Sequence, residues 1–105
     1  MSKRFAFLMK LKPECEDEYK KRHDEIWPEL VKLLQGAGIS DYSIFLDSGT
    51  LTLFALLHLS DDNTLGDLPN QPLMHKWWDY MADLMETNPD RSPVVTAIQE
   101  VFHMD

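Results

Sequence analysis

Two apolar segments separated by a short turn constrain the fold of this chain more than any other feature. Residues 39–47 (ISDYSIFLD) and 50–59 (TLTLFALLHL) are rich in aliphatic and aromatic side chains, and they flank the turn 47–49 (DSG). Two strand-forming segments joined by a few residues that include glycine indicate a β-hairpin. The fold must therefore contain an antiparallel pair of strands in the middle of the sequence.

The residues before this hairpin predict a strand and then a helix. Residues 3–11 (KRFAFLMKL) form an apolar stretch with alternating sides, which is typical of a strand. Pro13 opens a helical segment at a position where its missing N–H costs nothing, and Gly36 is a stop signal. Pro28 lies inside that segment, so we expect it to kink the helix or to restart it.

The residues after the hairpin predict a second helix and then a last strand. Residues 60–72 contain two prolines and a glycine, which predicts a long loop or a broken helix. Residues 73–86 return to a helical period, and 97–104 (AIQEVFHM) predicts a last strand. The order β-α-β-β-α-β predicts an α+β, ferredoxin-like antiparallel sheet with both helices on one face.

The strands carry apolar side chains on both of their faces. The chain has 105 residues, so we expect a single domain over 1–105. In the third expected strand Leu53 and Leu57 point to one side, whereas Phe54 and Leu56 point to the other. A second apolar face needs a cover. A second copy of the sheet, giving a twofold homodimer, or a pocket lined by that face would supply one, and both can hold at once.

Charge and cysteine content exclude several classes of function. The chain has 10 Lys and Arg against 18 Asp and Glu, a net charge of −8, which argues against nucleic-acid and anionic-membrane partners. A small neutral molecule fits better. The single cysteine, Cys15, excludes an intramolecular disulfide and a four-thiolate zinc site. No segment is apolar over a membrane-spanning length, and 1–14 (MSKRFAFLMKLKPE) lacks a signal-peptide core, so we expect a cytoplasmic protein.

A few aromatic and histidine residues are candidates for chemistry. Tyr19 and His23 are spaced i, i+4 on the first predicted helix, so they share a face near its apolar side. His23 has two interpretations: a core histidine held by a backbone carbonyl, or a general acid or base at a pocket wall. Trp77 and Trp78 either pack in the core or form a platform for a ligand. Tyr42 shares its strand face with other apolar residues. No histidine spacing indicates a metal site.

Several segments resemble the L-rhamnose mutarotase family. They are EYKKRHDEIWPEL (18–30), DYSIFLD (41–47), HKWWDYM (75–81), NPDRSPV (88–94) and QEVF (99–102). The resemblance covers nearly the whole chain in order. It implies a dimeric α+β barrel, an isomerase that interconverts the α and β anomers of L-rhamnose or a related 6-deoxy hexopyranose by general acid and base chemistry. It implies no cofactor and no metal.

The resemblance also implies roles for five residues. The family's proton donor corresponds to His23, and the tyrosine one turn earlier, which binds the sugar, corresponds to Tyr19. Further substrate contacts correspond to Tyr42, Trp77 and Trp78.

Residues 60–72 depart from the family pattern, which puts the preferred sugar in doubt if this segment borders the pocket. Two alternatives share the fold: a cofactor-independent monooxygenase and a non-catalytic dimer that binds a small ligand.

Overall fold

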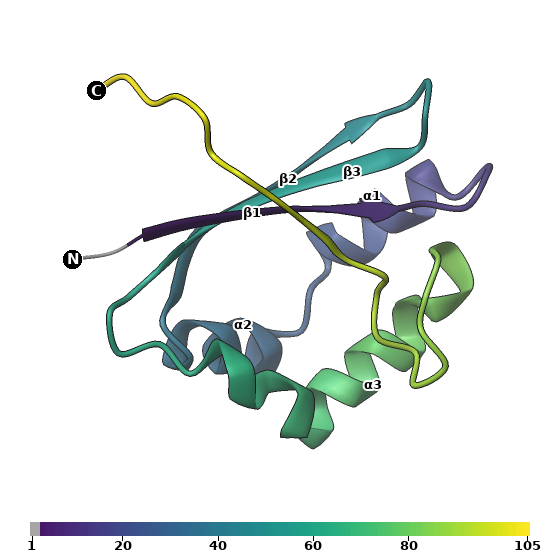
Figure 1. Cartoon of the computed structure of the whole chain (residues 1–105). Coiled ribbons are helices and arrows are strands. Elements are labelled where there is room, and N and C mark those ends of the chain that lie inside the picture. Colours follow the sequence, from purple (N-terminus) through teal and green to yellow (C-terminus); the bar gives the residue numbers. More distant parts are fainter. Residues whose placement is uncertain (1–2) are drawn as a thin grey trace.

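The computed structural model describes residues 3–105 and consists of a four-stranded antiparallel sheet with helices on one face (Figure 1). The strands lie in the order β2-β3-β1-β4. They are β1 (Lys3–Lys10), β2 (Ile39–Asp47), β3 (Thr52–Leu59) and β4 (Thr96–Ile98). This order and the hairpin of β2 and β3 confirm the predicted α+β, ferredoxin-like fold.

Three α-helices cover one face of the sheet, and all three lie on the same side of it in Figure 1. They are α1 (Glu16–Asp24), α2 (Pro28–Gly36) and α3 (Pro72–Met81). Pro28 is the first residue of α2 and follows an extended residue, so it restarts the helix as predicted. The segment 60–72 is a broken helix that includes the 3₁₀ turn Leu65–Asn70. The described residues contain no helix long and apolar enough to cross a membrane.

Most of the core lies between the sheet and these helices, on what we call the covered face. Leu53, Ala55 and Leu57 of β3 expose no more than 2% of their surface there. The side chains between them, Phe54 and Leu56, point to the opposite side and are 41% and 37% exposed. The period-two alternation of the strand therefore places apolar groups on both faces, as the sequence predicts.

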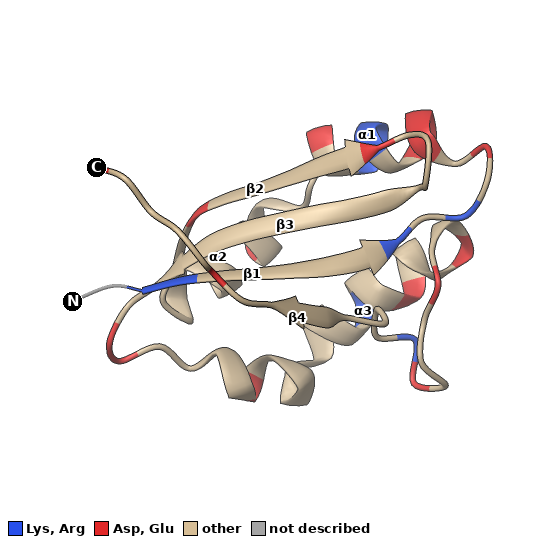
Figure 2. Ribbon diagram, turned by 45° about the horizontal axis from the view of Figure 1, so that its top comes forward, with Lys and Arg blue, Asp and Glu red and all other residues tan. Residues whose placement is uncertain are grey.

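We call the opposite side the open face, and it consists of two apolar rows. The strand register aligns Phe45, Phe54 and Leu8 in one row, and Leu56, Ala6 and Ile98 in the next. The ends of the strands carry charges but their middles do not (Figure 2). Phe45 is 63% exposed. An apolar sheet face of this kind is unusual in a monomer surrounded by water.

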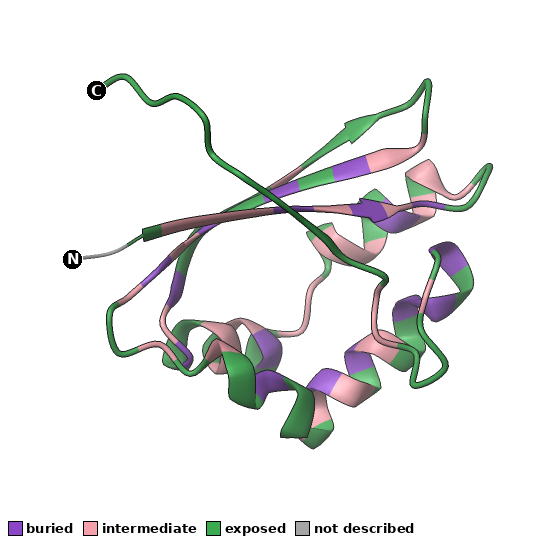
Figure 3. Cartoon of the chain, viewed as in Figure 1, coloured by how far each residue is buried: buried purple, intermediate pink, exposed green. Residues whose placement is uncertain are grey.

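The prediction of a strand over 97–104 was wrong for most of its length. β4 pairs with β1 only from Thr96 to Ile98, and 99–105 run away from the sheet as an exposed arm (Figures 1 and 3). Val101 and Phe102 are 89% and 79% exposed. The arm has the composition of a strand but it buries no apolar surface within this chain, and strand preference depends on such packing.

Candidate functional site

All five candidate site residues line one cavity between the covered face and the helices. The cavity has a volume of about 80 Å³. Tyr19 and His23 reach it from α1, Trp77 and Trp78 from α3, and Tyr42 from β2. These residues are far apart in the sequence, and the fold brings them together.

Tyr19 and His23 form the α1 wall of the cavity. They lie one helical turn apart, and their ring centroids are 4.3 Å apart. The His23 Nδ1 atom is 3.1 Å from the backbone oxygen of Tyr19. A carbonyl only accepts hydrogen bonds, so Nδ1 carries the proton and donates it to Tyr19. The other ring nitrogen, Nε2, is then left with its lone pair when the imidazole is neutral.

Burial sets the protonation state of His23. The imidazole packs edge-on against Trp77, with centroids 5.4 Å apart and an angle of 86°. Burial lowers the pKa of His23 below its ordinary value of 6.5, and the hydrogen bond to Tyr19 and the charge of Asp24 oppose this effect only in part. The neutral form therefore predominates at pH 7.

The two tryptophans of α3 have different environments. Trp77 is 7% exposed and packs edge-on against Trp27, with centroids 5.1 Å apart. Trp78 is half-buried and packs against His75. Adjacent residues on a helix point about 100° apart, so one ring enters the core while the other lies at its edge. Trp77 is therefore part of the core, as one interpretation of the pair predicted. Both rings also line the cavity, and their role as a platform for a ligand stays a prediction.

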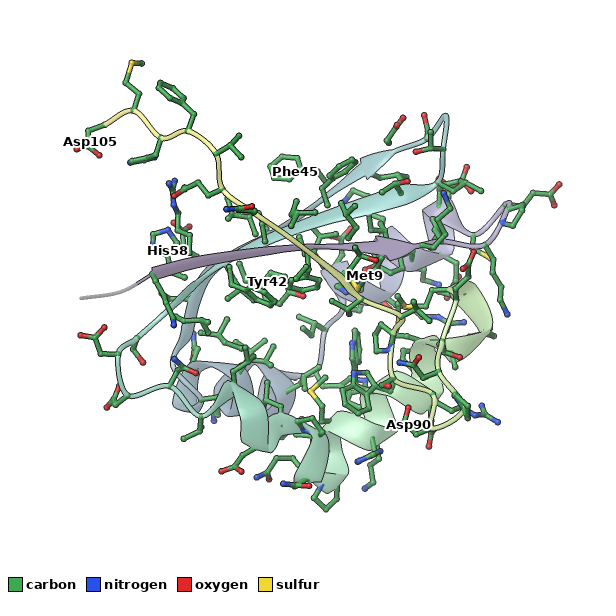
Figure 4. The ribbon with its side chains drawn as sticks, in the orientation of Figure 1. Met9, Tyr42, Phe45, His58, Asp90 and Asp105 are labelled. Atoms are coloured by element: carbon green, nitrogen blue, oxygen red, sulfur yellow. The ribbon has the colours of Figure 1, made fainter. Side chains whose placement is uncertain are left out.

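A β-bulge in β2 aims Tyr42 into the cavity. The pairing of β2 with β3 shifts between Ser40 and Ser43, and Asp41 adopts a φ of 51°. Strict alternation from Ile39 would place Tyr42 on the open face. The extra residue resets the alternation, so Tyr42 lies on the helix side of the sheet while Phe45 points away (Figure 4).

The hydroxyl groups of both cavity tyrosines stay protonated. Burial raises the pKa of Tyr19 well above its usual range, and the neighbouring Tyr42 raises it further. Burial also raises the pKa of Tyr42 to about 12, although the residue as a whole is 40% exposed. Both groups can donate hydrogen bonds to a ligand, but neither is suited to accept a proton as a base.

Several residues that line the cavity are not among those predicted from the sequence. Met9 comes from β1, while Arg91 and Pro93 come from the loop that precedes β4. Arg91 is the one lining residue with a charged side chain among those described, and no carboxylate lines the cavity there. The segment NPDRSPV (88–94) contributed to the family resemblance, but it assigned no role to Arg91 or Pro93. Its contact with the cavity is long-range, so no local pattern could have shown it.

A second, larger hollow lies elsewhere and contains none of the five residues. It has a volume of about 320 Å³ and lies between α2 and the turn Leu65–Asn70. The segment 60–72 contributes Asp67 and Leu68 to this hollow and nothing to the cavity of His23. The described residues hold no group of three or more His, Cys, Asp or Glu side chains placed to bind a metal ion.

Comparison with known proteins assigns the chain to a family. The family model described as L-rhamnose mutarotase matches residues 4–104. The chain belongs to the L-rhamnose mutarotase family. It is 55% identical over 104 residues to an L-rhamnose mutarotase of Mesorhizobium japonicum, covering 99% of both chains. It is 58% identical over 99 residues to one of Rhizobium leguminosarum bv. trifolii, covering 94% of this chain and 93% of the relative.

A solved structure extends the similarity to three dimensions. The crystal structure of an L-rhamnose mutarotase from Formosa agariphila superposes with a TM-score of 0.91 and is 50% identical in sequence. The match covers 98% of this chain and 99% of that one. Membership of the L-rhamnose mutarotase family, predicted from the motifs around His23 and Trp77, is thus confirmed, and the segment 60–72 lies within the matched length.

Proposed function

We propose that this chain is an isomerase that interconverts the α and β anomers of L-rhamnose or a related 6-deoxy hexopyranose. The observation that carries the proposal is the meeting of His23, Tyr19, Tyr42, Trp77 and Trp78 at one cavity in a member of this family. The cavity suits an uncharged ligand because its lining is mostly apolar and aromatic. Neither a monooxygenase nor a binding module is favoured by the family match.

The reaction requires two proton transfers, and the sugar neither gains nor loses a proton overall. Ring opening breaks the bond between the anomeric carbon and the ring oxygen, while the anomeric hydroxyl loses a proton and becomes a carbonyl. The ring oxygen gains a proton. Closure on the other face of the carbonyl reverses both transfers and gives the other anomer. This chemistry requires neither a redox step nor a covalent intermediate with the protein.

His23 is the group suited to carry these protons. Its Nε2 atom takes up the proton of the anomeric hydroxyl through a bridging water, and the imidazolium donates a proton to the ring oxygen. The hydrogen bond from Nδ1 to Tyr19 holds the ring in the tautomer that this step needs. A general acid or base of this kind contributes about 10² to 10⁴ in rate, which is enough for a reaction that already occurs in water.

The remaining residues bind the sugar. The hydroxyl groups of Tyr19 and Tyr42 donate hydrogen bonds to its oxygens, because their raised pKa values keep them protonated. Trp77 and Trp78 receive the C–H surface of the sugar and its methyl group. Burying one methyl group contributes about 0.8 kcal/mol, a few-fold preference. Hydroxyl recognition therefore sets most of the specificity.

The open face supports a homodimer. Two copies packed through the rows of Phe45 and Leu56 would remove both apolar surfaces from water and give a dimeric α+β barrel. The arm 99–105 adds Val101 and Phe102, which no part of their own chain buries. The chain acts as one domain over 1–105, with no nucleic-acid partner, in the cytoplasm. Its net charge of −8 and its single cysteine fit these conclusions.

Saturation-transfer NMR tests the function directly, because it measures the exchange between the two anomers of L-rhamnose. The wild-type chain should accelerate exchange, and His23→Ala should lower that acceleration by about 10² to 10⁴ while the protein stays folded. His58→Ala is the matched control because His58 lies on β3, outside the cavity. Unchanged exchange in His23→Ala would remove His23 from the mechanism.

A further inference from the structure

Arg22 joins the two helices that form the cavity, yet it does not line the cavity itself. Its side chain extends from the last turn of α1, next to His23, and is 14% exposed. The Nε atom donates to a carboxylate oxygen of Glu18 at 2.8 Å, within α1. The Nη1 atom donates to the backbone oxygen of Tyr80 at 2.5 Å and to Asp83 Oδ1 at 2.9 Å, at the end of α3.

The guanidinium also stacks on an aromatic cluster that reaches the cavity. It lies over the Tyr80 ring, 4.5 Å from the centroid. The Tyr80 ring packs against Trp27 and Trp77 with centroids 5.6 Å and 5.8 Å apart. Trp77 in turn contacts the His23 imidazole. One side chain thus fixes α1 to α3 on the outside, while the ring of His23 meets Trp77 on the inside.

The position of α1 depends on such contacts because the helix is short. It spans nine residues, Glu16–Asp24, and no side chain caps its N-terminus. Helices of this length are marginal alone, so tertiary contacts hold them in place. The described contacts of α1 with α3 include the ring contact of His23 with Trp77 and the polar contacts of Arg22.

We propose that Arg22 is a positioning residue, which fixes the His23 imidazole relative to Trp77 and Trp78 by anchoring α1 to Tyr80 and Asp83. This proposal rests on the proposed function for its effect on rate, but its effect on geometry is independent of any activity. The planar guanidinium serves three acceptors at once, on α1, on α3 and on the 3₁₀ turn Ala82–Leu84 that follows α3. A lysine has three donors on one nitrogen but lacks this planar fork. Asp83 is exposed, so its ion pair with Arg22 adds little to stability, and its charge-assisted hydrogen bond serves to hold the guanidinium in place.

The test compares variants that break the anchor with one that breaks a similar pair elsewhere on α1. Arg22→Met removes the anchor, Arg22→Lys keeps the charge without the fork, and Asp83→Asn removes the charged acceptor. The control is Lys20→Met, because Lys20 pairs with Asp24 at 2.7 Å within α1 and does not reach α3. The measurements are anomer exchange as a function of L-rhamnose concentration, and the NMR shifts of the His23 ring protons, which the edge-on Trp77 ring displaces.

Arg22→Met should lower kcat by about ten- to one-hundred-fold, because small misplacements of a catalytic group have effects of this size. KM should change much less. Arg22→Lys should restore only part of the loss. The His23 ring protons should move toward the shifts of an exposed histidine in Arg22→Met and in Asp83→Asn, while Lys20→Met leaves shifts and kcat unchanged.

Two results would overturn the proposal. One is an Arg22→Met or Asp83→Asn protein that is folded and has wild-type kcat and wild-type His23 shifts. The other is a higher KM and a lower melting temperature with unchanged kcat, which would make Arg22 merely structural. If Arg22→Met does not fold, the milder Asp83→Asn decides. A wild-type chain without anomer exchange would refute the proposed function instead, and the His23 shifts would still test the anchor.

Discussion

The covered face and the open face of the sheet come from the same strands but have opposite relations to the rest of the chain. On the covered face, Leu53 and Leu57 are buried by helices of their own chain. On the open face, Phe45 is 63% exposed, and no element among residues 3–105 covers it. Alternation in a strand determines which side chains share a face, but only the connections between strands determine which face is covered.

This difference separates chemistry from association. The cavity with His23 lies on the covered face, where helices contribute side chains that a sheet alone cannot supply. The open face has apolar area but, apart from the charged ends of its strands, no titratable cluster. We infer that the first face serves catalysis within one chain and the second serves a contact between chains. The predictions below test this division.

The largest effect is expected from a pair of neighbouring leucines on opposite faces. Leu57 is 2% exposed, so Leu57→Ala should reduce the free energy of unfolding by about 2–5 kcal/mol, through lost burial and a residual cavity. Leu56→Ala should cost about 1 kcal/mol in dilute solution, because Leu56 is 37% exposed. Urea denaturation at two protein concentrations measures both.

The reduction in the free energy of unfolding caused by Leu56→Ala should grow as protein concentration rises, because the wild type then gains stability from association. Equal losses at the two positions in dilute solution would mean that the open face is already packed within the chain.

The next effect concerns association. Phe45→Lys places a charge in the apolar row of the open face, on the edge strand β2, and burying this charge without a partner in a twofold contact opposes pairing by several kcal/mol. Light scattering should give twice the chain mass of 12.2 kDa for the wild type and a single mass for the variant. We expect anomer exchange per chain to persist, because the proposed proton carrier and the four proposed sugar contacts all come from one chain.

A monomeric Phe45→Lys that has lost exchange would show that the partner completes the site. The division between the two faces would then be wrong.

The smallest effect is that of pH on the rate of anomer exchange, which tests the protonation state of His23 on the covered face. Burial lowers the pKa of His23 below 6.5, so the neutral imidazole, which takes up the first proton, predominates above that value. The catalysed exchange should be level at neutral pH and should fall at acid pH. It should be about tenfold lower one unit below the midpoint, after the exchange in buffer alone is subtracted. A rate that rises on acidification would make the imidazolium the starting form.

Local patterns predicted most of the fold. The hairpin, the strand near 3–11 and the restart at Pro28 depend on neighbouring residues, and the structure has all three. The turn of the hairpin covers 48–51, so it is longer than the predicted 47–49. The facing of Tyr19 and His23 follows from a spacing of one helical turn. These features could be predicted because each depends on backbone preferences within a few residues.

Features that depend on distant partners could not be predicted in this way. The segment 97–104 has the composition of a strand, but only its first residues find a partner in β1. The contacts of Arg22 with Tyr80 and Asp83, and the approach of Arg91 to the cavity, join residues far apart in the sequence. Periodicity carries no information about such contacts. The meeting of the five site residues was expected from the family resemblance.

The bulge at Asp41 interrupts the alternation of side chains along β2. The residues between Asp41 and the hairpin pair with β3 in a register of their own, so the side of the sheet that each one faces does not depend on the pairing at Ile39. Deletion of Asp41 would remove the extra residue and restore strict alternation, with Ile39 and Tyr42 both still on the covered face. An unbulged strand of the present length would instead turn Ile39 and Tyr42 to opposite faces. The bulge therefore lets β2 carry one additional residue while the side chains on both sides of it keep the same face.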